Sequence, residues 1–164
     1  MDTVDKGTRS RIMASVGQSD TRPEMTLRRE LHRLGFRYTV NDKRLPGSPD
    51  LVFAKYRAAI FVHGCFWHSH GCKYSTIPET KREFWREKFR ANRARDKREL
   101  SRLRSSRWRA KVVWECRLRG NRRKIQICVS GISKWLRSGN ANARIGVSTR
   151  RTSPGRSADS IHAH

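Results

Sequence analysis

The stretch that decides the fold is Ala58-Ala59-Ile60-Phe61-Val62, followed at once by His63-Gly64-Cys65-Phe66-Trp67-His68-Ser69-His70-Gly71-Cys72. The first part is an apolar run with the length and composition of a buried strand. The second part holds two thiols, three imidazoles and two large aromatic rings. The sequence therefore predicts reactive side chains mounted on the end of a rigid strand.

Cysteine and histidine in this segment have the spacing of a metal site. Cys65, His70 and Cys72 follow the pattern C-x4-H-x-C, which lets one loop wrap three ligands around a single ion. Cys116 follows a second apolar run, residues 112–114, and can supply a fourth ligand. Three sulfurs and one imidazole make a closed tetrahedral zinc site, and a closed site is structural rather than catalytic.

Composition points to a polyanionic partner. The 164 residues and 35% hydrophobic content suit one domain with a modest core. Lys and Arg number 38 against 14 for Asp and Glu, and this net charge of +24 indicates nucleic acid. No stretch approaches the roughly 18 apolar residues of a membrane span, and the first residues lack the apolar centre of a signal peptide. We therefore expect no membrane partner and a cytoplasmic, nucleoid-associated protein, in which clustered cysteines are more often metal ligands than disulfides.

The chain divides into one domain between two basic ends. Residues 1–18 contain Arg9 and Met13 in a short basic segment, which is either a frayed terminus or an arm that orders on nucleic acid. Residues 19–137 carry periodic apolar patterns, whereas residues 138–164 have none and are expected to be a disordered basic tail. Apolar periodicity predicts helices at 20–34, 78–105 and 122–136, and strands at 36–40, 50–54, 57–62 and 109–114.

Asp50 is acidic in a chain where acids are scarce, and it stands between Pro49 and an apolar strand. Such a carboxylate is either a salt-bridge acceptor or a ligand for a hard ion such as Mg²⁺. A turn at Lys55-Tyr56 joins two strands whose register brings Asp50 to the end of the second, beside the carbonyl of Val62 and His68. Carboxylate and backbone oxygens both bind Mg²⁺, which takes the rest of its shell from water and phosphate, so such a site would cut a phosphodiester.

Three roles are open for His68: it is a general base, an exposed loop histidine, or the zinc ligand in place of His70. Asp96 lies on the apolar stripe of the long expected helix, where a carboxylate needs a buried donor such as an imidazole N–H. A His–Asp pair would fix the tautomer so that the other ring nitrogen can take a proton from water. Glu24 fits a Thr21-x-x-Glu24 capping box, and a contact with metal-bound water is the alternative for it.

Phe66 and Trp67 are consecutive aromatic residues between metal ligands. Both cannot easily face inward in a tight loop, so we expect at least one to project to solvent. In a polycation, an exposed ring beside a hydrolytic centre suggests a wedge that enters a base stack. The alternative is that Trp67 covers the zinc.

Several gapless blocks occur in a fixed order: Asp5-Lys6, Thr8-Arg9-Ser10, Met13, Leu45-Pro46-Gly47, Pro49-Asp50, His63-Gly64-Cys65-Phe66-Trp67-His68, Cys72, Glu83-Phe84-Trp85, Arg95-Asp96 and Val113-Trp114-Glu115-Cys116. In this pattern the chain resembles the very short patch repair endonucleases, which nick DNA at thymine-guanine mismatches left by deamination of 5-methylcytosine. The resemblance covers about Asp5 to Gly120.

The resemblance implies a fold and a set of roles. The fold is a restriction-endonuclease-like α/β core, a mixed β-sheet flanked by helices, with a structural zinc site. The implied roles are Mg²⁺ binding by Asp50, general base at His68, support of that base by Asp96, zinc binding by Cys65, His70, Cys72 and Cys116, and intercalation beside the mismatch by Met13, Phe66 and Trp67.

Two places depart from the family pattern. The family commonly has threonine where this chain has Val62, so the backbone carbonyl that would meet the metal is kept but a hydroxyl is lost. The histidine-rich run is thinned by Ser69 and Gly71, although His70 keeps its ligand position.

We therefore expect a Mg²⁺-dependent DNA endonuclease that nicks double-stranded DNA at T:G mismatches and acts as a monomer. The expected catalytic residues are Asp50, His68, Asp96 and Glu24, and Arg9 is expected among the DNA contacts. One alternative is a zinc-stabilised nucleic-acid-binding protein without activity, in which Asp50 and His68 are structural. Another is a structure-specific nuclease that is indifferent to the type of mismatch.

Overall fold

The computed structural model describes residues 19–77, 79 and 81–139. The expected N-terminal arm, with Arg9 and Met13, and nearly all of the expected tail lie outside these residues. The first described helix, α2 (Arg22–Arg33), has a proline in its first turn and Glu24 near its positive end. It ends at Arg33 with Leu34 as the C-cap, and Gly35 follows with φ of 86°, as the sequence predicts for a glycine stop.

The centre of the fold is a four-stranded mixed sheet in the order β1-β2-β3-β4. The strands are β1 (Thr39–Val40), β2 (Leu51–Phe53), β3 (Ala58–His63) and β4 (Arg109–Trp114). The pairs β1–β2 and β2–β3 are antiparallel, whereas β3 and β4 run parallel. The mixed α/β architecture agrees with the sequence prediction.

Strand β1 is shorter than the predicted span 36–40 because the residues before it pack instead of pairing. Phe36 is buried, and its ring meets that of Phe53 edge-on with centroids 6.1 Å apart. The Tyr38 ring lies 5.6 Å from the same Phe53, and its hydroxyl donates to the carbonyl of Arg28 at 2.8 Å. Aromatic packing thus takes the place of strand pairing in this segment.

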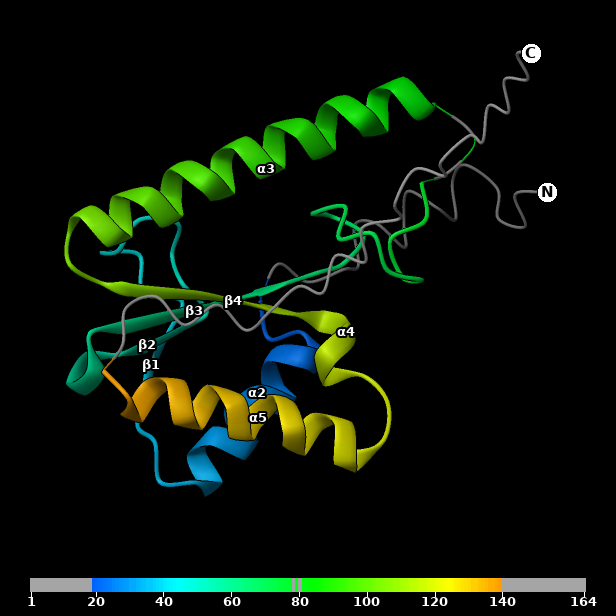
Figure 1. Ribbon diagram of the computed structural model, residues 1–164. Helices are drawn as coiled ribbons and strands as arrows, with labels where there is room; N and C mark the ends of the chain where they lie inside the picture. Colours follow the sequence, from blue (N-terminus) through cyan, green and yellow to red (C-terminus); the bar gives the residue numbers. More distant parts are fainter. Residues whose placement is uncertain (1–18, 78, 80, 140–164) are drawn as a thin grey trace, which may run out of the picture.

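Helices cover both faces of the sheet (Figure 1). Helix α3 (Arg82–Ser105) lies on one face, and α2, α4 (Glu115–Leu118) and α5 (Arg122–Arg137) lie on the other. Helix α3 begins at Arg82 rather than at the predicted Pro78, because Lys81 adopts a left-handed conformation with φ of 58°. Of its predicted apolar stripe, Phe89 and Leu103 are buried.

The alternation of side chains along β3 builds a core on each face of the sheet. Ala58 and Ile60 belong to the larger core on the α2–α5 face, and Ala59 and Phe61 to the smaller core beneath α3. The larger core contains Leu27, Leu31, Phe36, Leu51, Phe53, Ala58, Ile60, Val113, Leu118, Val129, Ile132, Trp135 and Leu136. Strand β3 is thus covered on both faces and is a rigid support for the residues that follow it.

Within the described residues no helix has both the length and the apolar character needed to cross a bilayer.

Candidate active site and metal centre

Asp50 meets the end of β3, as the strand register predicts. Leu51 pairs with Ile60 in the antiparallel ladder, so Asp50 lies beside the last residues of β3. Its carboxylate Oδ2 accepts the backbone N–H of Val62 at 2.7 Å. Burial raises the pKa of Asp50 to about 6, and the hydrogen bond from Val62 only partly offsets this. The site therefore holds a poorly solvated carboxylate, which a divalent cation would stabilise.

The carbonyl of Val62 also faces this side of β3. Within a strand, the N–H and C=O of one residue project toward the same neighbour, and the Val62 N–H points at Asp50. A carboxylate and a backbone oxygen are the donor types that Mg²⁺ takes from proteins. These two groups are therefore chemically suited to a magnesium ion.

Glu24 is buried, with 3% of its surface exposed, and several donors surround its carboxylate. Oε1 accepts the hydroxyl of Thr21 at 2.7 Å, and Oε2 accepts the backbone N–H of Asp20 at 2.9 Å. Arg28 donates to Oε2 at 3.2 Å and also pairs with Asp20. The predicted capping box is therefore wrong in detail, since the Thr21 hydroxyl bonds the carboxylate instead of a helix N–H.

The pair that the sequence suggested between His68 and Asp96 is present. His68 Nδ1 lies 2.5 Å from Asp96 Oδ2. The carboxylate can only accept, so Nδ1 carries the proton and Nε2 is left free. Burial acts to raise the pKa of Asp96, but the hydrogen bond from His68 together with the electrostatic effects of His63, His68 and Arg95 outweighs it, and the pKa is lowered. Asp96 thus remains ionised and holds the imidazole in one tautomer.

His63 completes this group, and the sequence reading missed it. Its ring stacks on that of His68, with centroids 3.8 Å apart and an angle of 8° between the planes. Burial, aided by His68, lowers the pKa of His63 to about 3, so the ring is neutral. Its Nδ1 lies 3.9 Å from the Asp96 carboxylate, and these three side chains could also hold a cation. The sequence does carry a signal for this role. If the strand continues one residue beyond the apolar run 58–62, His63 is its last residue and its imidazole is held in place.

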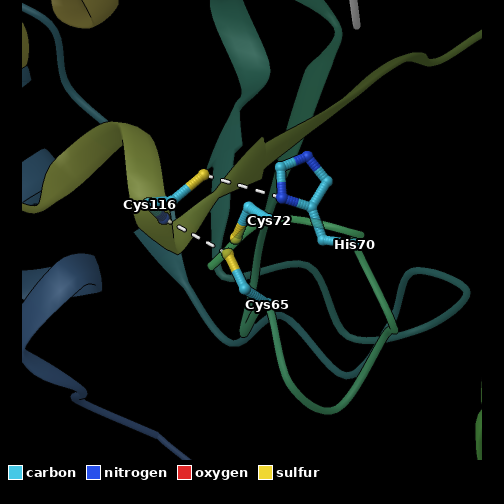
Figure 2. A group of neighbouring side chains, drawn as sticks. All are labelled: Cys65, His70, Cys72 and Cys116. Carbon is cyan, nitrogen blue, oxygen red and sulfur yellow. Dashed lines mark hydrogen bonds between the residues drawn. The ribbon is translucent and has the colours of Figure 1, made fainter. Parts of the chain in front are cut away.

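A second group of side chains has the composition of a zinc centre (Figure 2). The ligand atoms of Cys65, His70, Cys72 and Cys116 all lie within 4.8 Å of one another. A tetrahedral zinc ion with bonds of about 2.3 Å to sulfur places its ligands at separations within this range. The chain thus folds with four suitable donors gathered round one point.

Two strand ends bring these ligands together. Cys65 follows β3, whereas Cys116 lies just beyond β4. Because Val62 and Val113 pair in parallel, the segments that follow these two strands begin at the same edge of the sheet. The backbone N–H of Cys116 donates to Cys65 Sγ at 3.4 Å. Burial raises the pKa of the Cys65 thiol to about 12 in the absence of a cation. A bound metal ion would favour the thiolate instead.

The aromatic residues of the loop pack against α3. Phe66 and Trp67 are both half-buried, and the Phe66 ring lies 5.1 Å from Trp85 and 5.4 Å from Phe89. The ammonium group of Lys88 lies 5.5 Å from the centroid of the Trp67 ring. The sequence predicts that at least one of these rings projects into solvent. Instead, the two rings form the edge of an aromatic cluster, and the ammonium group of Lys88 lies against this cluster.

Trp114 stacks on the zinc-ligand candidate His70. The two rings are 4.1 Å apart at 15°. The Trp67 carbonyl accepts a hydrogen bond from Asn92 of α3 at 2.9 Å, which ties the other side of the loop to that helix. The indole that lies against the metal centre is thus supplied by the last residue of β4.

Comparisons with known proteins identify the family of this chain. Residues 1–74 match the family model described as DNA mismatch endonuclease Vsr. The chain is 41% identical to the DNA mismatch endonuclease Vsr of Escherichia coli, over 88% of this chain and 93% of the relative. It is 44% identical to the type II nicking enzyme V.XorIIP of Xanthomonas oryzae pv. oryzae, over 71% of this chain and 86% of the relative. A third relative, the type II nicking enzyme V.NmeAIP of Neisseria meningitidis, is 37% identical over 83% of this chain and 94% of its own length. The chain belongs to the Vsr family of DNA mismatch endonucleases.

Proposed function

We propose that this protein is a mismatch repair endonuclease that nicks double-stranded DNA at T:G mismatches by Mg²⁺-dependent hydrolysis. The observation that carries the proposal is that two groups are each held against the end of β3. Asp50 bonds the N–H of Val62, and His68 stacks on the next residue, His63. A metal-ligand carboxylate and a general base are thereby anchored on adjacent residues of one strand.

The residues divide the chemistry between them. His68 takes a proton from water at Nε2 while its Nδ1–H donates to Asp96. The resulting hydroxide attacks the phosphorus in line, the P–O bond to the leaving sugar oxygen breaks, and that oxygen takes a proton from solvent. Mg²⁺ bound by Asp50 and the carbonyl of Val62 would supply positive charge to the phosphate oxygens. Glu24, whose negative charge acts on Asp50, is the candidate to orient water in the metal's shell. The neutral ring of His63 stacks on that of His68 and holds the proposed base in position.

The aromatic cluster is the proposed site of mismatch recognition. Phe66 and Trp67 would enter the base stack from one side, and Met13 of the N-terminal arm would intercalate beside the same mismatch. Such wedges unstack bases at a cost of about a few kcal/mol per step, and phosphate contacts offset this cost. The net charge of +24 favours these contacts, with Arg9 among them.

The remaining proposals concern architecture. Residues 19–137 form the endonuclease domain, with a restriction-endonuclease-like core, between a DNA-binding arm at 1–18 and a basic tail at 138–164. Zinc held by Cys65, His70, Cys72 and Cys116 is structural, because four protein ligands leave no open position. We propose a monomer acting on cytoplasmic, nucleoid DNA, since one nick needs one active site.

The test is a nicking assay with and without Mg²⁺ on duplexes that carry T:G, other mismatches or full pairing. Nicking of the T:G duplex alone, only with Mg²⁺, supports the proposal. Equal cutting of all duplexes would replace it with a structure-specific nuclease. Binding without cutting would leave a zinc-stabilised DNA-binding protein.

A further inference from the structure

Glu115 holds the metal-binding loop from outside it. Its carboxylate Oε2 accepts the backbone N–H of Cys65 at 3.2 Å. The adjacent residue, Cys116, donates its backbone N–H to the sulfur of Cys65 at 3.4 Å. The chain just beyond β4 therefore fixes both the amide and the thiol of one zinc-ligand candidate. Cys116 is itself one of the zinc-ligand candidates, whereas Glu115 is not.

Arg119 carries this connection to the far end of the loop. It forms an ion pair with Glu115, whose side chain is only 17% exposed. Its guanidinium also lies 5.2 Å from the centroid of the Tyr74 ring. Tyr74 comes two residues after the ligand Cys72. A continuous set of contacts, Glu115 to Arg119 to Tyr74, thus links the beginning and the end of the ligand-bearing segment.

We propose that Glu115 and Arg119 form a clasp that holds residues 65–74 closed around the metal ion, as positioning residues and not as ligands. The inference rests on the proposed zinc site. A hydrogen bond to the ligand-bearing backbone fixes where the sulfur points, and such outer contacts typically change metal affinity about 10- to 100-fold. Because Trp67 and His68 belong to the same segment, the clasp also keeps the base in front of Asp96.

The local charges support this assignment. Arg119 neutralises the carboxylate that would otherwise lie close to thiolates, so Glu115 can bond Cys65 without repelling the ligand set. The planar guanidinium can pair with a carboxylate and stack on an aromatic face at once, which an ammonium group does poorly. The chemistry of both side chains is therefore used, and an Arg119→Lys variant is expected to keep only the ion pair.

The experiment measures the rate at which the zinc-loaded full chain releases zinc to a chromogenic chelator. Glu115→Ala and Arg119→Ala should each release zinc about tenfold faster than wild type, and Arg119→Lys should be intermediate. The double variant should be no faster than Glu115→Ala, because the two residues act as one unit. Tyr74→Ala is a milder variant that leaves the Cys65 contact intact and should also be faster. The matched control is Glu30→Ala with Arg33→Ala, which removes an exposed ion pair from α2.

Each result decides the question. Release rates within twofold of wild type in the Glu115 and Arg119 variants, or a wild-type chain that binds no zinc, would overturn the clasp. Multiplying effects in the double variant would overturn it too, since they would mean two independent contacts. The nicking assay is read separately: a wild-type chain that shows the expected release pattern but does not nick T:G DNA refutes the proposed function alone.

Discussion

His63 and His68 stack face to face, with ring centroids 3.8 Å apart, and both approach the same carboxylate oxygen of Asp96. One ring belongs to a strand buried on both faces and the other to the loop beyond it. The strand thus sets the position of a loop residue through ring contact, and the carboxylate from α3 sets its tautomer. This arrangement makes the site depend on three elements at once.

The two loop histidines should separate cleanly by substitution. His68→Ala removes the proposed base and should reduce nicking by about 10²- to 10⁴-fold, while zinc content stays near one per chain. His70→Ala should instead reduce the zinc content. Metal analysis of both purified variants checks this, and zinc loss in the His68 variant would show that the two roles are exchanged.

Asp96→Asn should reduce the rate of the chemical step more than DNA binding. An amide can donate to His68 Nδ1 as well as accept from it, so the imidazole is no longer held with Nε2 free. We expect a fall in single-turnover rate of about 10²-fold or more, with the dissociation constant for T:G DNA unchanged within about threefold. A variant with full rate would show that the pair is only structural.

Removal of zinc should loosen the fold around the sheet edge. A structural zinc site contributes its binding free energy to folding, so the zinc-free chain is expected to melt at a lower temperature than the loaded chain. Cys116→Ser should reproduce the lower melting temperature and should show little further change on adding a chelator. Cys128→Ser is the matched control, because Cys128 lies outside the ligand cluster among the described residues.

The raised pKa of Asp50 predicts an effect of pH on stability in chelator. The folded-state pKa of about 6 exceeds the ordinary 3.8, so this group favours folding fully below about 3.8 and loses that contribution as pH rises through 6. At pH 8 the ionised carboxylate costs up to about 3 kcal/mol. Asp50→Asn should therefore raise the free energy of unfolding at pH 8 but not at pH 3.5, while abolishing nicking. Equal effects at both pH values would contradict the burial of this charge.

Arg28→Met should destabilise the fold. Arg28 is 7% exposed and pairs with Glu24, which would be left buried with one donor fewer. We expect a loss of about 3 kcal/mol, as for other broken buried pairs. Arg33→Met removes an exposed partner of Glu30 on the same helix and should cost under about 1 kcal/mol. Urea unfolding of the two variants provides the comparison.

The sequence predicts those contacts that follow from short turns and regular periods. The tight turn between β2 and β3 leaves little freedom in register, so the meeting of Asp50 with Val62 could be anticipated. Helical spacing likewise placed Asp96 on the face of α3 that meets the loop. Cysteine spacing alone indicated the cluster around Cys65.

Other contacts depend on packing that no local pattern encodes. The role of His63 requires that β3 extend one residue beyond its apolar run, which is decided by pairing with Trp114 of β4. The stacking of Trp114 on His70 joins residues from distant parts of the chain. The shortening of β1 results from competition between strand pairing and the burial of Phe36. In each case tertiary contacts override the local signal.

The parallel pairing of β3 with β4 has a consequence for how the protein folds. Cys65 and Cys116 are 51 residues apart, and α3 must cross between their strands before the two meet. Contacts of such long sequence separation form slowly, because the chain must lose conformational entropy before the strand pairing contributes favourable free energy. Tight zinc capture should therefore be a late event during refolding, and its time course would report the moment at which the sheet closes.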